Sequence, residues 1–94
     1  MELSDVRGKI GTIDGEILQL IAERTDLASS VLKLKKGDGK SIKDVMQEQF
    51  VLNRAIDRAT ELNLDTGSIK QIFEILIRMN IERQHELSGE GNLP

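Results

Sequence analysis

Two cations and two amides occupy positions where aliphatic side chains would be expected. Arg24 interrupts an apolar series with steps of three and four residues, which runs through Leu3, Val6, Ile10, Ile13, Ile17, Leu20, Leu27, Val31 and Leu34. Lys35 follows Arg24 by eleven residues, so in a helix the two cations share a face about 16 Å apart. Asn80 and Gln84 interrupt the apolar face of a later segment. Because a buried unpaired charge is costly, this combination favours a pocket that holds a small dianion.

A purely structural interpretation exists for each of these residues. A polar group in an apolar seam can specify the register or the oligomeric state of a helical bundle. Arg24 can pair with Asp44 or Glu48 inside the bundle, and the amides can satisfy one another or a helix end. Taken singly, each residue favours this interpretation, and only the set favours a binding site.

Arg7 lies seventeen residues before Arg24, about 25 Å away along a helix and turned by about 100°. It does not reach the same pocket within one chain. If two long helices pair antiparallel, the partner's Arg7 moves toward the middle of this one. On spacing alone, Arg7 is an ordinary surface arginine.

The composition describes a small helical domain with an aliphatic core. The chain has 94 residues, of which 31% are charged, and its only aromatic rings are Phe50 and Phe73. The absence of cysteine excludes disulfides and thiolate zinc sites, and the net charge of −3 argues against a nucleic-acid partner. With no membrane-spanning run and no signal-peptide pattern, we expect a cytoplasmic protein. No metal motif and no nucleophile–base pair is present, so any chemistry depends on electrostatics and positioning.

The apolar pattern predicts an all-α fold of three helices, one long and two shorter. We expect the first helix to start at an N-cap Ser4 and to stop at Gly37, the second to start at Asp44, and the third at Asp65 or Thr66. Residues 37–41 are expected to form a mobile loop, and the domain to span 1–87 with a flexible tail at 88–94.

The first helix is too long for a compact chain of this size. Its length of about 50 Å exceeds the diameter of about 30 Å that a 94-residue globule has. Its apolar stripe would therefore extend beyond the domain. A second copy of the chain is the simplest cover for that stripe.

Three segments together resemble the all-helical class of chorismate mutase. They are VRGKIGTIDGEILQLIAERTDLASSVLKLK at 6–35, IKDVMQEQ at 42–49 and IFEILIRMNIERQ at 72–84. The resemblance implies an intertwined homodimer of three-helix chains with two active sites, each built from both chains. It also implies the pericyclic rearrangement of chorismate to prephenate in phenylalanine and tyrosine biosynthesis, without a cofactor or a metal.

The resemblance also implies a role for each residue. The partner's Arg7 and this chain's Arg24 would bind the two substrate carboxylates, and Lys35 and Gln84 would donate to the ether oxygen. The remaining residues would bind the ring hydroxyl, a carboxylate or the apolar part of the substrate: Asp44, Glu48, Asn80, Val31, Val51 and Ile77. Gln47 departs from the pattern, because similar enzymes carry an arginine there, so the pocket lacks one positive charge.

Two other functions remain open from the sequence. An isochorismate-pyruvate lyase resembles these mutases and uses a similar cationic pocket, and spacing does not separate the two. A non-enzymatic helical dimerisation module would use Arg24, Asn80 and Gln84 only to specify pairing.

Overall fold

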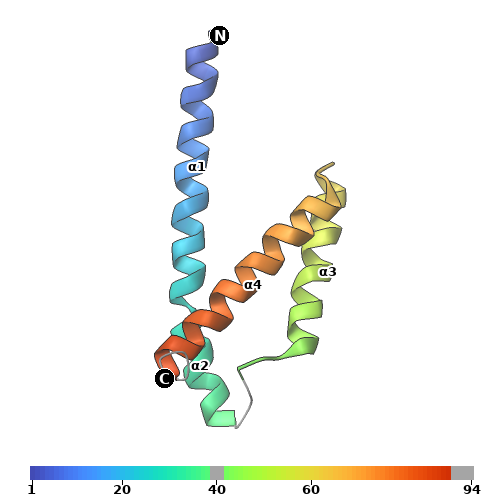
Figure 1. Cartoon of the computed structure of the whole chain (residues 1–94). Helices are drawn as coiled ribbons and strands as arrows, with labels where there is room; N and C mark the ends of the chain where they lie inside the picture. The colour runs from blue at the N-terminus through green and yellow to red at the C-terminus, as the bar shows by residue number, and fades with distance from the viewer. Residues whose placement is uncertain (39–41, 90–94) are drawn as a thin grey trace.

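The computed structural model describes residues 1–38 and 42–89, and this part of the chain is helical without a strand. The helices are α1 (Leu3–Asp26), α2 (Ala28–Asp38), α3 (Val45–Glu61) and α4 (Thr66–Ser88). Figure 1 shows α1 and α2 stacked end to end, with α3 and α4 beside them. The predicted all-α fold is confirmed.

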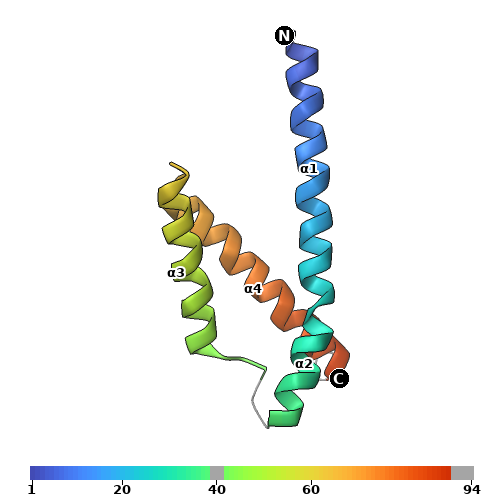
Figure 2. The ribbon, with the colours of Figure 1, turned by 180° about the vertical axis from the view of Figure 1, so that it is seen from behind.

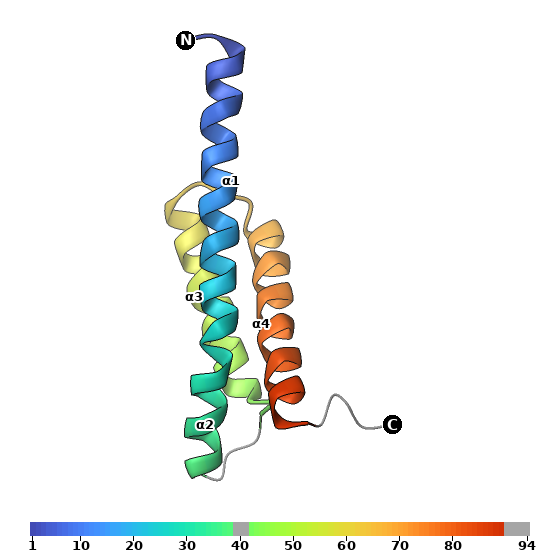
Figure 3. The same ribbon diagram turned by 90° about the vertical axis from the view of Figure 1, so that its left-hand side faces the viewer.

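Helices α1 and α2 form one rod with a single irregular residue, Leu27, between them. The Leu27 N–H donates to the carbonyl of Glu23 at 3.1 Å, and the Val31 N–H donates to the carbonyl of Leu27 at 3.0 Å. The helical hydrogen bonds therefore continue through the junction, and the chain has the three rods that the sequence predicts (Figure 3). Thr25 and Ser29 flank Leu27. The Thr25 hydroxyl donates to the carbonyl of Ile21 and the Ser29 hydroxyl to that of Asp26, a type of contact that often bends helices.

Both predicted ends of the first helix need correction. The N-cap is Glu2 rather than Ser4, because the Asp5 carboxylate accepts from the Glu2 N–H at 3.1 Å and extends the helix backward. At the other end, α2 continues through Gly37 to Asp38, since a glycine is tolerated in a helix at a cost of about 1 kcal/mol. The first two residues of the expected loop are therefore helical, and its remainder, 39–41, lies outside the described residues.

The caps of α3 and α4 follow the sequence prediction. Asp44 accepts from the Gln47 N–H at 3.1 Å, and Asp65 accepts from the N–H and the hydroxyl of Ser68 at 2.8 and 2.7 Å. Both bonds from Ser68 lower the pKa of Asp65, and the bond from the hydroxyl has the larger effect. Ser88 is the last residue of α4, and Gly89 caps it in the left-handed region at φ 85°. The division at residue 87 stays a prediction, and 90–94 lie outside the described residues.

The core of the single chain is small and lies between α3 and α4. Val51, Leu52 and Ile77 form a buried cluster, and Phe73 and Ile81 pack against it. Other buried apolar side chains are Ala28, Leu32, Ala55 and Ala59.

The first half of α1 projects away from this core, as seen from both sides in Figures 1 and 2. The described chain measures 54 × 26 × 24 Å, and α1 contains no buried residue. Six of its exposed apolar side chains, which we call the α1 stripe, belong to the apolar series of the sequence: Leu3, Val6, Ile10, Ile13, Ile17 and Leu20. The mismatch between rod and globule that the sequence predicts is therefore present in the structure.

Within the described residues, no helix is long and apolar enough to cross a membrane. The expected cytoplasmic location stays a prediction.

Candidate active site

A cavity of about 380 Å³ lies where the end of the α1–α2 rod, the start of α3 and the second half of α4 meet. It is lined by all ten of the predicted site residues that belong to a single chain. These are Arg24, Val31, Lys35, Asp44, Gln47, Glu48, Val51, Ile77, Asn80 and Gln84. The cavity therefore brings together the residues that spacing singled out, such as Arg24 and Lys35, and those that only the resemblance implied.

Arg24 reaches the cavity from the rod and contacts the backbone of α4. Its guanidinium donates to the carbonyl oxygen of Leu76 at 3.1 Å. No ion pair joins Arg24 to a carboxylate among the described residues, so the predicted alternative pairing with Asp44 or Glu48 is not observed. Burial lowers the pKa of Arg24, and the positive charge of Arg54 lowers it further. The site therefore holds a partly desolvated positive charge that an anionic ligand would stabilise.

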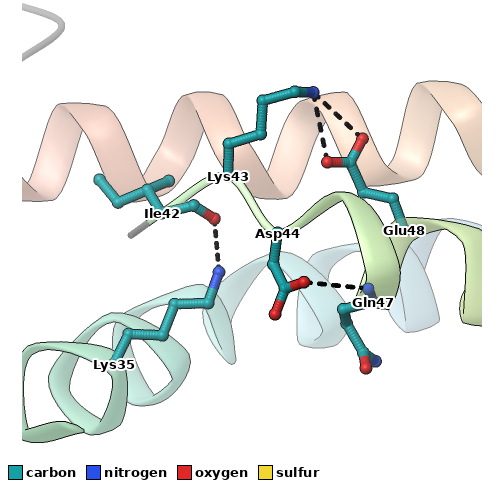
Figure 4. Close-up of polar contacts among 6 residues, drawn as sticks. All are labelled: Lys35, Ile42, Lys43, Asp44, Gln47 and Glu48. Carbon is teal, nitrogen blue, oxygen red and sulfur yellow. Dashed lines mark hydrogen bonds and ion pairs between the residues drawn. The ribbon is translucent and has the colours of Figure 1, made fainter. Parts of the chain in front are cut away.

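Lys35 enters from α2, and its ammonium donates to the carbonyl oxygen of Ile42 in the segment before α3 (Figure 4). The side chain is half-buried and lines the cavity. An ammonium has three donors, so this contact fixes the direction of the side chain and leaves other N–H bonds for a ligand.

The first turn of α3 contributes Asp44, Gln47 and Glu48. Asp44 has two roles, since it lines the cavity and its carboxylate caps the helix through the Gln47 N–H. Glu48 accepts from the ammonium of Lys43 with both carboxylate oxygens, at 3.3 and 3.2 Å. Figure 4 shows these contacts following one another along the start of the helix.

Asn80 and Gln84 lie one turn apart on α4 and present buried polar atoms to the cavity. Gln84 is only 3% exposed. The side-chain oxygens of both amides are buried without a hydrogen-bond partner among the described residues. A buried polar atom without a partner costs about 1–3 kcal/mol. These two atoms therefore indicate a site that a ligand or a second chain completes.

Arg7 is the predicted site residue that the structure does not bring to the cavity. It lies in the projecting half of α1 and is exposed. Its separation from Arg24 along the rod, about 25 Å, explains why it cannot serve the pocket of its own chain. Its role in the site stays a prediction that depends on a second chain.

Three apolar lining residues were not predicted as site residues: Leu34, Ile42 and Ile81. Leu34 belongs to the apolar series of the rod, and Ile81 lies four residues after Ile77 on the same face of α4, so both carried a periodic signal. Ile42 lies before the start of α3, where no helical period identifies the buried side.

The chain is similar to known proteins over most of its length. Residues 6–85 match the family model described as chorismate mutase type II. The chain is 39% identical over 89 residues to a chorismate mutase of Methanocaldococcus jannaschii, covering 95% of this chain and 90% of that protein. It is 32% identical over 82 residues to the bifunctional chorismate mutase/prephenate dehydratase of Escherichia coli (strain K12), covering 87% of this chain and 21% of that protein.

A third relative is the 3-dehydroquinate dehydratase of Pyrobaculum aerophilum, 31% identical over 77 residues. The match covers 82% of this chain and 22% of that protein. The chain thus matches one relative over nearly its full length and about a fifth of the two longer ones. With the family model covering residues 6–85, the chain belongs to the chorismate mutase type II family.

Proposed function

We propose that this chain is an isomerase that converts chorismate to prephenate in a cavity completed by a second copy of the chain. The observation that carries the proposal is the convergence of Arg24 and Lys35 on one cavity, where neither is ion-paired with a carboxylate among the described residues. Two separated cations suit a small substrate with two carboxylates. The side-chain amides of Asn80 and Gln84 line the same cavity, and their N–H groups can donate to further oxygens of the substrate.

The proposed roles follow from where each group lies. Arg24 binds one carboxylate of the substrate, and the partner's Arg7 binds the other. Lys35 and Gln84 donate to the ether oxygen from two sides of the cavity, since they come from α2 and α4. Glu48 and Asp44 accept from the ring hydroxyl, and Asn80 donates to a carboxylate. Apolar side chains, including Val31, Val51 and Ile77, surround the hydrocarbon part.

Two physical effects would accelerate the rearrangement. Binding both carboxylates selects the folded substrate conformer in which the reacting carbons approach each other, which lowers the entropy cost of the reaction. Negative charge grows on the ether oxygen as its bond to carbon breaks. Donors preorganised toward that oxygen then bind the transition state more tightly than the substrate. A concerted rearrangement requires no nucleophile and no cofactor.

The α1 stripe supports the dimer in this proposal. The six aliphatic side chains of this stripe are exposed, and an exposed apolar surface of this kind marks an interaction site. An antiparallel partner rod would cover it and would carry the partner's Arg7 toward the cavity. Sedimentation at micromolar concentration is expected to show a dimer, and a stable folded monomer would contradict the shared site.

An assay of purified protein tests the activity. We expect the absorbance of chorismate to decay with prephenate as the product, and isochorismate to remain unchanged. Release of pyruvate from isochorismate, without conversion of chorismate, would identify a lyase instead. A dimer that converts neither substrate and gains no thermal stability from a transition-state analogue would indicate a dimerisation module.

A further inference from the structure

Three consecutive residues before α3 each make a hydrogen bond or an ion pair with a different residue of the cavity wall. The carbonyl oxygen of Ile42 accepts from the ammonium of Lys35, and the carboxylate of Asp44 accepts from the N–H of Gln47. Between them, the ammonium of Lys43 contacts both carboxylate oxygens of Glu48. Figure 4 shows the three contacts side by side. This short segment therefore orients wall residues that come from both α2 and α3.

Lys43 differs from its two neighbours because its side chain is not part of the cavity wall. The Lys43 side chain is 64% exposed, whereas the Glu48 side chain that it contacts is 23% exposed and lines the cavity. Distances of 3.2 and 3.3 Å to the two oxygens place the ammonium across the carboxylate rather than at one end. Such a contact restricts rotation of the Glu48 carboxylate.

The charge of Lys43 also matters in this particular cavity. Glu48 is an anion in a cavity proposed to receive a dianion, and the adjacent wall residue Gln47 is neutral. A cation on the outer side of Glu48 offsets the repulsion between that carboxylate and the substrate. It does so without occupying space in the cavity.

We propose that Lys43 is a positioning residue, which fixes the Glu48 carboxylate for the ring hydroxyl and offsets its negative charge. This inference rests on the proposed function, in which Glu48 accepts from that hydroxyl. Lys43 contacts Glu48 and not the substrate. Its contribution should appear in substrate binding, because the hydroxyl is bound in the ground state and in the transition state alike.

The test compares Lys43→Met, Lys43→Arg and the control Lys70→Met. Lys70 is exposed on α4 and lies outside the cavity, and its replacement removes the same unit of charge from the chain. We expect Lys43→Met to raise KM about two- to fivefold with kcat nearly unchanged, as is typical of a partly exposed ion pair. Lys43→Arg should retain the wild-type KM, and Lys70→Met should leave both constants unchanged. Thermal unfolding verifies that each variant is folded.

A double-mutant cycle with Glu48→Gln then separates positioning from direct binding. If Lys43 acts through Glu48, adding Lys43→Met to Glu48→Gln should change KM no further. The same fold increase in that background would show that Lys43 acts on the substrate directly, and an equal effect of Lys70→Met would show a general charge effect. An unchanged KM in Lys43→Met would also overturn the proposal. Failure of the wild-type protein to convert chorismate would refute the proposed function instead.

Discussion

The guanidinium of Arg24 donates to the carbonyl oxygen of Leu76 at 3.1 Å, and this bond joins the α1–α2 rod to α4. The contact orients Arg24 but does not neutralise it. The folded chain therefore maintains a positive charge at a position where its apolar series would otherwise continue. A partly buried charge without an ion-pair partner lowers stability unless an anion binds to it.

Replacing Arg24 separates its effect on stability from its proposed effect on substrate binding. Burial lowers the pKa of Arg24, which means that folding disfavours its charged form, and the penalty is present at every pH below that pKa. We expect Arg24→Met to lower kcat/KM by about 10²–10³-fold, as the loss of a key charged contact does, without lowering the melting temperature. Thermal unfolding and steady-state kinetics on the same preparation check both parts. A clearly less stable variant that keeps its activity would contradict the assigned role.

Gln84 provides a test by pH. An amide does not titrate, so the wild-type donor functions at all pH values, whereas a carboxyl donates only when it is protonated. We expect Gln84→Glu to be active in acid and nearly inactive at neutral pH. Gln84→Ala, which has no donor, should be weakly active throughout, and the two pH–rate profiles are compared. Equal activity of Gln84→Glu at both pH values would exclude a contact with the ether oxygen.

Gln47 tests whether the missing positive charge matters. Its side chain lines the cavity while its backbone N–H satisfies the Asp44 cap, so a substitution leaves the cap bond intact. We expect Gln47→Arg to lower KM, because an added cation binds the dianion in the ground state and the transition state alike. Gln49→Arg adds the same charge at an exposed position of α3 outside the cavity and serves as the control. An unchanged KM in Gln47→Arg would show that the missing positive charge does not limit substrate binding.

The sequence was most informative where one local rule determines the structure. Asp44 was identified as a cap, and Asp65 as one of two candidates, because a carboxylate before an apolar run satisfies the free N–H groups of a helix start. Glu2 was missed because Ser4 is the stronger cap by residue type, and the acceptor of the Glu2 N–H is the side chain of Asp5. The irregularity at Leu27 was missed as well, since its apolar side chain continues the helical pattern.

The site was predictable to the extent that it lies on helices. Arg24 and Lys35 were linked by a spacing of eleven residues, and both line the cavity. Ile42 and the contacts of Lys43 were not predictable, because they depend on the path of the chain between α2 and α3, and no periodicity describes that path. The role of Arg7 is not determined by the single chain, because the cavity that it would serve belongs to a second copy.

Asp65 predicts a pH dependence of stability. Its pKa in the folded chain is lowered by the hydroxyl and the N–H of Ser68, so the carboxylate stabilises the fold above its unfolded pKa, about 3.9. That contribution is lost as the pH falls through the lowered folded value. Asp65→Asn keeps an acceptor for the cap but does not titrate. We expect it to melt below the wild type at pH 7, with the difference decreasing as the pH falls below the unfolded pKa and through the lowered folded one. Asp57→Asn, an exposed carboxylate within α3, should show no such convergence.

The last prediction concerns the assignment of Arg7 to the partner's cavity. Arg7→Ala and Arg24→Ala should each give a nearly inactive homodimer, because every cavity then lacks one carboxylate-binding arginine. In a mixed dimer, the cavity around the Arg7→Ala chain keeps its own Arg24 and receives an intact partner's Arg7, so it is complete. The cavity around the Arg24→Ala chain lacks both.

Co-refolding equal amounts of the two variants gives about half mixed dimers by random pairing, each with one complete cavity of two. About a quarter of the wild-type activity should therefore return in a two-fold symmetric assembly. The chains must be unfolded and refolded together, because intertwined subunits exchange slowly, and each variant refolded alone provides the baseline. If Arg7 served the cavity of its own chain, both arginines would belong to one site and each chain would inactivate its own. Mixing would then restore nothing, and a refolded mixture no more active than its components would refute the shared site.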